Sequence, residues 1–290
     1  MNGILLVDKD AGWTSNDVVV KLKGILHERR VGHSGTLDPM ATGLLVIFAG
    51  RATRAVEFAE RDEKRYLASL RLGQTTDTQD VTGNILETRP VHIEAEELER
   101  TLARFRGEQT QIPPMYSAVR VAGRRLYDIA RKGGEVERAP RRVTVRELTL
   151  LGREGEDWLL DVRCSKGTYI RTLCHDIGQS LGCGGCMSAL RRTEAGGFSV
   201  KDAVGIEEIQ RLRDEGRIEE RLLPTDRLFS REKACAATAE EEKRIRCGSD
   251  YGTGLADGVY RVYNESGVFL MLGRAEAGRM KTIKNFFEVS

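Results

Sequence analysis

A glycine-rich, polar loop near the N-terminus carries the acidic residue best suited to chemistry. The stretch GHSGTLDPMATG, residues 32–43, precedes the apolar run LLVIFAG, and its only acid is Asp38. Pro39 favours an extended backbone at Asp38, and the glycines allow unusual dihedral angles and close ligand approach. A carboxylate on such a loop can act as a covalent nucleophile, while a simple turn is the alternative. His33 could contact phosphate or a base, or could only stabilise the loop.

Residues able to bind a metal ion or a nucleotide cofactor show weaker patterns. The histidines form no HxxxH or HxE pattern; they are His27, His33, His92 and His175. Cys183 and Cys186 have zinc-type spacing, but Cys164 and Cys174 do not supply a second well-spaced pair. Ordinary free thiols are therefore favoured over a zinc site or a redox centre. The chain has no Walker-type phosphate loop and no GxGxxG, so we expect neither a metal nor a cofactor.

The bulk composition is that of an ordinary globular protein. Its 290 residues suffice for one large domain and one small domain. No apolar stretch approaches the ~20 residues of a membrane-spanning helix, and the N-terminal residues lack a signal-peptide layout. Six cysteines in a chain of this length do not form a secreted disulfide scaffold. We therefore expect a cytoplasmic protein with no membrane partner.

One segment is far more basic than the whole chain, whose net charge is only +2. Residues 115–146 carry nine basic and three acidic side chains, so the local charge is nine minus three, or +6. Arginine suits planar contacts with phosphate groups, although a solvated charged face is the plain alternative. The segment opens at Pro113-Pro114 and has few large apolar residues. It is predicted to be an inserted, projecting arm over about residues 113–142.

Apolar periodicity predicts strands and helices that alternate without regular βαβ order. The expected strands are Ile4–Lys9, Leu44–Ala49, Tyr66–Leu72, Val143–Leu151 and Trp158–Cys164. The expected helices follow Thr14 (with His27, Arg29 and Arg30 in the last turn), span ATRAVEFAE and Glu94–Arg106, and end the stretch SKGTYIRTLCHDIGQSL. GQTTDTQDVTG is predicted to be a loop. This pattern favours a mixed α/β sheet over a doubly wound one.

The C-terminal part is predicted to form a separate small domain. The polar stretch 205–221 and Pro224 indicate a boundary. Beyond it, VYRVYNESGVFLMLGR has two alternating runs on either side of residues 264–267, which is typical of a β-hairpin. We therefore expect a larger domain over residues 1–224 and a β-rich domain over residues 225–290.

Six stretches of the chain resemble, in order, motifs of the TruB family of bacterial tRNA pseudouridine synthases. They are LLVDKDAGWTS, VGHSGTLDPMATGLL, KRYLASLRLGQTTDTQDVTG, PPMYSAVRVAGRRLYDIAR, SKGTYIRTLCHDIG and LRRTEAGGF. The resemblance runs from end to end and implies a mixed, largely antiparallel sheet with flanking helices, followed by a PUA-like domain. Cys186-Met187 departs from the family, where relatives often have His-Leu, and we expect a packing variation there.

The resemblance also places functional roles on individual residues. It implies that Asp38 is the catalytic carboxylate, that Tyr66 lies over the target base, and that Arg171 pairs with Asp38. His33 is the candidate to fill the space that an extruded base leaves. The predicted substrate-binding residues are His33, Tyr169, Leu190, Asp80, Lys9, Arg120 and Arg124.

The activity that the resemblance implies is conversion of uridine 55 in the T-arm of tRNA to pseudouridine, by base flipping and without a cofactor. Such a site must hold the detached base away from water, between apolar walls and beside one ionised acid. The expected partner is the T-stem-loop of tRNA, bound by a monomer with no obligatory protein partner. Two alternatives stay open: an enzyme that acts on other RNAs or with a guide RNA, and an RNA-binding or folding module with secondary catalysis.

Overall fold

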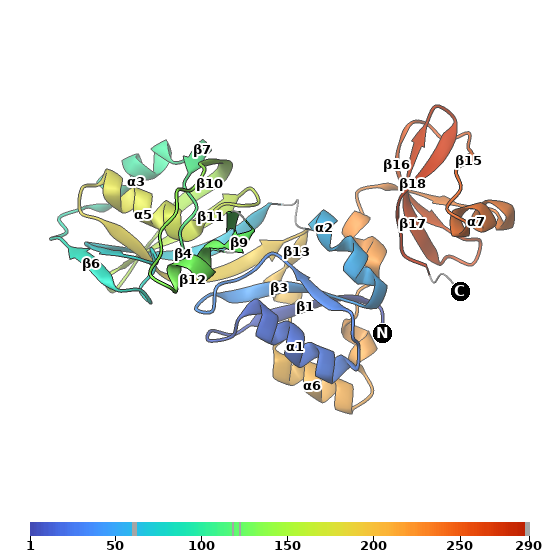
Figure 1. Cartoon of the computed structure of the whole chain (residues 1–290), viewed down its shortest axis with the longest axis horizontal. Helices are drawn as coiled ribbons and strands as arrows, with labels where there is room; N and C mark the ends of the chain where they lie inside the picture. Colours follow the sequence, from blue (N-terminus) through green and yellow to red (C-terminus); the bar gives the residue numbers. More distant parts are fainter. Residues whose placement is uncertain (60–62, 118, 122, 288–290) are drawn as a thin grey trace.

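Two β-sheets, one large and one small, organise the chain (Figure 1). The computed structural model describes residues 1–59, 63–117, 119–121 and 123–287. The strands of the large sheet in these residues are β1 (Gly3–Lys9), β2 (Val31–Ser34), β3 (Thr42–Ala49), β4 (Lys64–Leu72), β7 (Gly107–Gln111), β10 (Arg141–Glu154), β11 (Asp157–Cys164), β12 (Gly185–Ala195) and β13 (Phe198–Ser199). Their main order is β1-β3-β12-β4-β11-β10-β7, with β2 beside β3 and β13 beside β12.

Neighbouring strands of the large sheet are antiparallel except where β12 meets β3. That parallel contact joins Arg191 to Thr42 and Arg192 to Gly43. Gly43 has φ +97°, and an added Cβ would lie 2.3 Å from the Arg192 carbonyl oxygen, so the two backbones approach too closely for a side chain. The mixed, largely antiparallel sheet expected from the sequence is confirmed, as are its predicted strands.

Burial follows the strand patterns that the sequence shows. β3 is buried along nearly its whole length because side-chain clusters cover both of its faces. β4 alternates instead, with Tyr66, Ala68, Leu70 and Leu72 in the core and the residues between them more exposed. The predicted face of β4 is therefore correct. Tyr66 lies on this face, which packs in one core cluster with residues 95–104 and 170–180 and is called the inner face of the sheet.

Two pairs of helices cover different ends of the large sheet. Figure 1 shows α1 (Ser15–Leu26) beside α6 (Ile206–Asp214) at the β1–β3 end. The other pair, α3 (Ala95–Arg104) and α5 (Ile170–Ser180), covers the end that holds β4 and β10. A capping box between Thr14 and Asp17 starts α1, as the polar cluster predicted.

The predicted end of the first helix is wrong. His27 adopts a left-handed conformation (φ 48°) and caps α1, so Arg29 and Arg30 lie beyond the helix rather than in its last turn. The predicted helix ATRAVEFAE forms a 3₁₀ segment, η1 (Gly50–Ala55), and one turn of α-helix, α2 (Val56–Ala59). Its final residue, Glu60, lies outside the described residues.

Two segments between β4 and β10 in the chain contain short strands of their own. The segment predicted as a loop at GQTTDTQDVTG begins with a strand, β5 (Gln74–Thr76), which pairs with β6 (Ile85–Thr88), so the prediction is only partly correct. The basic segment contains β8 (Arg120–Val121), β9 (Arg124–Arg125) and α4 (Leu126–Ala130). Its last residues, Arg141 and Arg142, already belong to β10 and pair with β7.

The small sheet lies in the C-terminal part of the chain, apart from the large one (Figure 1). Its strands run in the order β14 (Lys233–Ala236), β16 (Gly258–Tyr263), β17 (Phe269–Glu276), β18 (Arg279–Asn285) and β15 (Tyr251–Gly252), with α7 (Ala239–Arg246) beside them. The predicted hairpin is confirmed as β16–β17. Phe229, in a 3₁₀ segment, η4 (Thr225–Phe229), packs against Phe58 and Phe286 and so links the two sheets. The domain boundary near residue 224 stays a prediction.

The short 3₁₀ segments η2 (Val200–Asp202) and η3 (Ile218–Arg221) complete the connection between the sheets. Leu223 pairs with Ile4 of β1 through two backbone hydrogen bonds of 2.8 Å, so the connection is tied to the edge of the large sheet. None of the helices in the described ranges has the length and apolar character needed to cross a lipid bilayer.

Candidate active site

The loop between β2 and β3 holds Asp38 through hydrogen bonds on both sides of it. The Ser15 hydroxyl accepts from the Leu37 N–H (2.8 Å) and donates to the Leu37 carbonyl (3.1 Å). The Pro39 carbonyl accepts from the Gly12 N–H at 2.8 Å and from the Lys9 ammonium at 3.3 Å. Because these contacts are largely shielded from water, the loop presents Asp38 in a fixed position.

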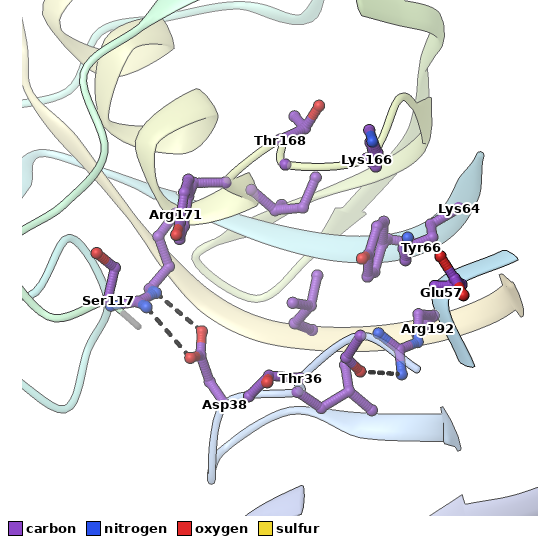
Figure 2. A pocket seen from close by; sticks show the side chains of 16 residues that line it. Thr36, Asp38, Glu57, Lys64, Tyr66, Ser117, Lys166, Thr168, Arg171 and Arg192 are labelled. Atoms are coloured by element: carbon purple, nitrogen blue, oxygen red, sulfur yellow. Dashed lines mark hydrogen bonds and ion pairs between the residues drawn. The ribbon is translucent and has the colours of Figure 1, made fainter. Parts of the chain in front are cut away.

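Arg171, in the first turn of α5, faces the carboxylate of Asp38 (Figure 2). Its Nε lies 2.9 Å from Asp38 Oδ2, and its Nη2 donates to Oδ1 at 3.2 Å. This two-point geometry is the strong form of an arginine–carboxylate pair. The guanidinium is buried and also donates to the carbonyls of Thr78 (3.1 Å) and Tyr116 (2.9 Å), which fix its plane. Arg171 and Asp38, which the resemblance pairs, are therefore in direct contact.

Asp80 lies on the other side of Arg171, at 3.6 Å between Oδ2 and Nη1. Its second oxygen accepts from the hydroxyls of Thr78 (2.8 Å) and Thr82 (2.5 Å) and from the Thr82 N–H (2.9 Å). Gln79, at φ 64°, turns this loop toward the site, and its side-chain oxygen accepts from Thr172 of α5 at 2.8 Å. The arrangement holds one buried cation between two carboxylates.

The electrostatics of Asp38 reflect two opposed effects. Burial raises the pKa of this carboxyl above its ordinary value, and the Arg171 guanidinium opposes that rise by favouring the ionised form. Asp80 adds a like charge that raises the pKa of Asp38 further. Arg171 is therefore the group that favours the anionic form of this half-buried carboxylate.

A pocket of about 420 Å³ opens from Asp38 toward β4 and β12. Tyr66 and Leu190 line it, and their strands are hydrogen-bonded neighbours, since Leu190 pairs with Ala68. Burial raises the pKa of Tyr66 to about 12, and the nearby Arg192 opposes that rise. The phenol is therefore neutral near pH 7. An aromatic and an aliphatic side chain beside a carboxylate suit a flat, polar ring that is held away from water.

Four further predicted residues lie in different places. Tyr169 lines the pocket, and both of its main-chain polar groups bond to the Gln111 side chain, at 3.0 and 3.2 Å. His33 lies on β2 opposite Ile47 and is not a lining residue; burial lowers its pKa. Arg120 and Arg124 pair with neighbours across the β8–β9 hairpin of the arm, where both are exposed and line no pocket wall.

Lys9 was predicted to bind substrate, but it lies beneath the Asp38 loop and is fully buried. Its ammonium donates to the carbonyls of Asp10 (2.9 Å), Trp13 (2.8 Å) and Pro39 (3.3 Å). Burial lowers the pKa of Lys9 to about 8, against the opposing charges of Asp10 and Asp38. This placement corrects the predicted contact with substrate to a role in holding the loop.

Sequence reasoning missed three cations of the pocket, Lys64, Lys166 and Arg192. All three stand in stretches that carry the family resemblance, KRYLASLRLGQTTDTQDVTG, SKGTYIRTLCHDIG and LRRTEAGGF, so a signal was present without an assigned role. Arg192 is fully buried, which charge and spacing alone do not indicate for an arginine beside another arginine.

The cysteines near the site are buried thiols. Cys183 and Cys186 are both enclosed, and burial raises the pKa of Cys186 to about 11. In the described part of the chain, no group of three or more His, Cys, Asp or Glu side chains could hold a metal ion. The adjacent Met187 is also fully buried, and only its main chain bonds to the Asp80 loop, through Gln79 and Val81. A change of side chain at 186–187 therefore alters packing and leaves these backbone contacts in place.

Solved structures identify the fold. The chain superposes with a TM-score of 0.75 on a chain from the crystal structure of a Cbf5-Nop10-Gar1 complex, at 24% identity, covering 99% of this chain and 85% of that one. A chain from an H/ACA RNP bound to a substrate RNA containing 2′-deoxyuridine gives a TM-score of 0.73 at 22% identity, with 99% and 86% covered. The large sheet, its helices and the small sheet therefore share the fold of these two chains.

Sequence comparisons identify the family. Residues 23–170 match the model described as TruB family pseudouridylate synthase (N terminal domain), and residues 171–230 match the tRNA pseudouridylate synthase B C-terminal domain. A protein of Clostridium kluyveri named tRNA pseudouridine synthase B is 40% identical over 99% of this chain and 100% of its own length. A protein of the same name from Syntrophomonas wolfei is 43% identical, with 95% and 94% covered. The chain belongs to the TruB family and is a pseudouridine synthase, an isomerase.

Proposed function

We propose that this enzyme converts uridine 55 in the T-arm loop of tRNA to pseudouridine, with Asp38 as the catalytic residue and without a cofactor. The observation that carries the proposal is the two-point pair of Asp38 with the buried Arg171 at the mouth of a pocket lined by Tyr66 and Leu190. The names of the similar proteins, which are tRNA pseudouridine synthases B, support tRNA as the substrate.

The reaction moves one bond and one proton. The bond from ribose C1′ to uracil N1 breaks, the base turns, and C1′ bonds to C5; the C5 proton leaves and N1 gains a proton. Ionised Asp38 can attack C1′ as glycosidase carboxylates do, attack the base, or assist elimination. Each route needs the carboxylate charged, which Arg171 favours. The three routes differ in what Asp38 does, and all of them use the same side chains.

Tyr66 and Leu190 then have complementary roles. Tyr66 offers a flat face for an extruded uracil, and Leu190 closes the pocket on the other strand. Because the pKa of Tyr66 is raised to about 12, its hydroxyl is protonated near pH 7 and can relay a proton only as a neutral phenol. Enclosure by these two side chains keeps the detached base from leaving before it re-bonds.

RNA binding by other parts of the chain would bring the uridine to this pocket. The arm over residues 113–142 carries exposed arginines, including Arg120 and Arg124, that suit the irregular backbone of a stem-loop. We assign the β-rich residues 225–290 a PUA-like role at the acceptor end, and His33 the space that the extruded base leaves. The enzyme would act as a cytoplasmic monomer without an obligatory protein partner.

The direct test is product mapping with the purified protein alone. Unmodified tRNA transcripts should gain pseudouridine at position 55, and transcripts with cytidine there should gain none. Modification at other uridines instead would overturn the position. Activity only after addition of a guide RNA would favour a guide-dependent enzyme, and tight binding without any tritium release from C5-labelled uridine would favour an RNA-binding module.

A further inference from the structure

Arg192 of β12 is a fully buried cation that donates hydrogen bonds to main-chain carbonyls of the described residues. Its side chain is fully buried, and within the described residues it forms no ion pair with an acid. Nε donates to the Leu44 carbonyl at 2.7 Å, and Nη2 donates to the Gly35 carbonyl at 3.0 Å. The remaining terminal nitrogen, Nη1, makes no hydrogen bond of normal geometry to the described residues, although the Arg192 guanidinium is close enough to the Tyr66 hydroxyl to lower the pKa of that hydroxyl. Two of its three nitrogens therefore fix the plane of the guanidinium, and the third, Nη1, is available to a group that enters the pocket.

Such an arrangement is costly unless another group completes it. An unpaired buried charge is strongly destabilising, and buried polar groups in proteins nearly always have partners. Arg171 shows the usual solution in this molecule, because Asp38 and Asp80 flank it. Arg192 has the same burial but forms no ion pair with an acid of the described residues, so an anion that enters the pocket would complete its contacts.

The pocket provides space for that partner next to Nη1. Figure 2 shows Arg192 and Lys64 near Tyr66, at the end of the pocket away from Asp38 and Arg171. Glu57 also lines this end, so the pocket there holds two cations and one carboxylate. Gly35 also lines this end; an added Cβ there would lie 3.4 Å from Arg192 Nη1 and 3.1 Å from Lys64 Cε. Gly35 has φ +76°, where a side chain would be strained as well. The glycine therefore leaves open the space that faces both cations.

We propose that Arg192 and Lys64 form an anion subsite at the Tyr66 end of the pocket, and that it binds a phosphodiester group adjoining the target uridine of the RNA. A phosphate group can accept hydrogen bonds from a guanidinium and an ammonium together. Its negative charge would also be the counter-charge for Arg192. The proposal rests on the proposed function, since it names what the same pocket holds besides the base. Anchoring a neighbouring phosphate would fix the extruded nucleotide between the subsite and Asp38.

The test uses RNA stem-loops in which one phosphate is replaced by a neutral methylphosphonate, either 5′ or 3′ to the target uridine. Binding and single-turnover rates are measured for the wild type, Arg192→Lys and Lys64→Met. At one of the two positions the neutral group should weaken wild-type binding about 10- to 100-fold, as loss of a charge-assisted contact would. Both variants should bind native RNA more weakly and show little further loss with that methylphosphonate.

A matched control is Arg106→Lys, because Arg106 also donates Nε to a main-chain carbonyl, that of Leu148 at 3.0 Å, but does not line the pocket. It should show the full wild-type response to the methylphosphonate. The subsite is overturned if neither replacement weakens wild-type binding. It is also overturned if the methylphosphonate weakens binding by the variants as much as it weakens binding by the wild type. Lys64→Met keeps the test open should Arg192→Lys fail to fold. Conversion of the unmodified stem-loop by wild type is scored separately, so the proposed function can hold while the subsite fails.

Discussion

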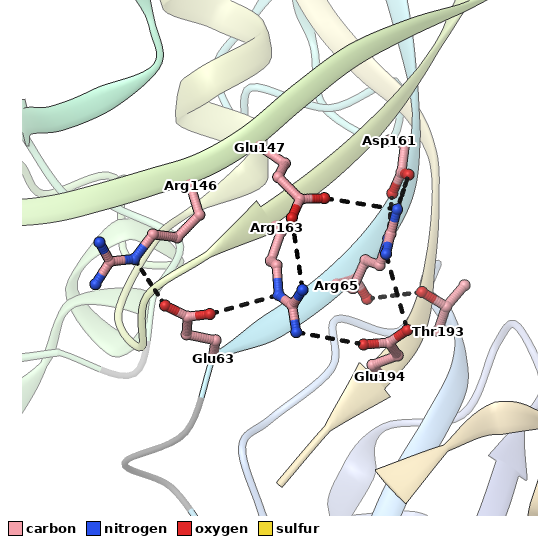
Figure 3. A network of polar contacts seen from close by, with 8 residues as sticks. All are labelled: Glu63, Arg65, Arg146, Glu147, Asp161, Arg163, Thr193 and Glu194. Atoms are coloured by element: carbon pink, nitrogen blue, oxygen red, sulfur yellow. Dashed lines mark hydrogen bonds and ion pairs between the residues drawn. The ribbon is translucent and has the colours of Figure 1, made fainter. Parts of the chain in front are cut away.

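The same kind of charge pair occurs on both faces of the large sheet, in two different environments. On the inner face, the side chain of Arg171 is 5% exposed and pairs with Asp38. On the outer face, Arg65 pairs with Asp161 at 2.6 Å, and Arg163 reaches Glu63, Glu147 and Glu194 (Figure 3). The side chains of Arg65 and Arg163 are 32% and 39% exposed. Consecutive residues of β4, Arg65 and Tyr66, serve these two regions because strand side chains alternate.

The difference shows that environment, rather than pairing, decides what an arginine–carboxylate pair does. Water screens the outer network, so each of its pairs is expected to contribute about 0–1 kcal/mol to stability. In the inner pair the arginine side chain is only 5% exposed while the Asp38 side chain is 35% exposed, and this carboxylate has a raised pKa that the arginine opposes. The outer pairs therefore join strands, and the inner pair, in the mechanism that we propose, prepares a reactive anion.

The largest contrast should come from removing each arginine in turn. Arg171→Met leaves Asp38 without its counter-charge, and we expect kcat/KM to fall about 10²–10³-fold, as for loss of a preorganised charge in an enclosed site. Arg71→Met is the matched control, since Arg71 also makes a two-point pair, with Asp157 at 2.8 and 3.1 Å, and is 33% exposed. Its activity should stay close to wild type. Equal losses in both variants would show that pairing matters more than environment.

Tyr66 separates packing from proton transfer on the inner face. Tyr66→Leu removes the ring, and the rate should fall about 10- to 100-fold because aromatic stacking on a base contributes about 1–3 kcal/mol. Tyr66→Phe keeps the ring and should lose less, with the remaining deficit measuring the role of the hydroxyl. A near-normal rate for Tyr66→Phe would exclude a proton relay through the hydroxyl. A near-normal rate for Tyr66→Leu would show that the ring has no role in the reaction.

The pH dependence of the inner pair should differ from that of an ordinary aspartate. The pKa of Asp38 is raised, and its ionised form is the active one. The value of kcat/KM should therefore reach its maximum at higher pH and fall as the pH drops through the raised pKa of Asp38. The acid limb should therefore lie above the usual aspartate pKa of 3.8. In Arg171→Met it should move to still higher pH. An acid limb that stays in place in this variant would contradict the pairing argument.

The smallest effect is expected on the outer face. Arg163→Gln removes contacts to three glutamates, yet the free energy of unfolding should fall by less than about 1 kcal/mol because the pairs are exposed and screened. Denaturant titration at low and high salt measures this, with the difference shrinking at high salt. A loss well above 2 kcal/mol, by the same comparison with exposed pairs, would mean that the network is less screened than its exposure indicates.

Features with a local cause could be predicted from the sequence. The alternation in β4 and the capping residues at Thr14 are set by neighbours along the chain, and both are as predicted. The end of α1 was placed too late because nothing in the local pattern shows that His27 adopts a left-handed conformation. Lys9 and Arg192 depend on which distant carbonyls surround them, so their burial requires the tertiary structure. Asp38, Tyr66 and Arg171 were placed through the family resemblance rather than through their spacing.

The most direct test of the account is pseudouridine formation by Asp38→Asn, with Asp157→Asn as the matched control from the Arg71 pair. The amide keeps the shape of Asp38 but cannot be an anion, so Asp38→Asn should bind the T-stem-loop with near wild-type affinity and form no pseudouridine in a single turnover. Asp157→Asn should form product at close to the wild-type rate. Appreciable product from Asp38→Asn would show that this carboxylate is not the reactive group.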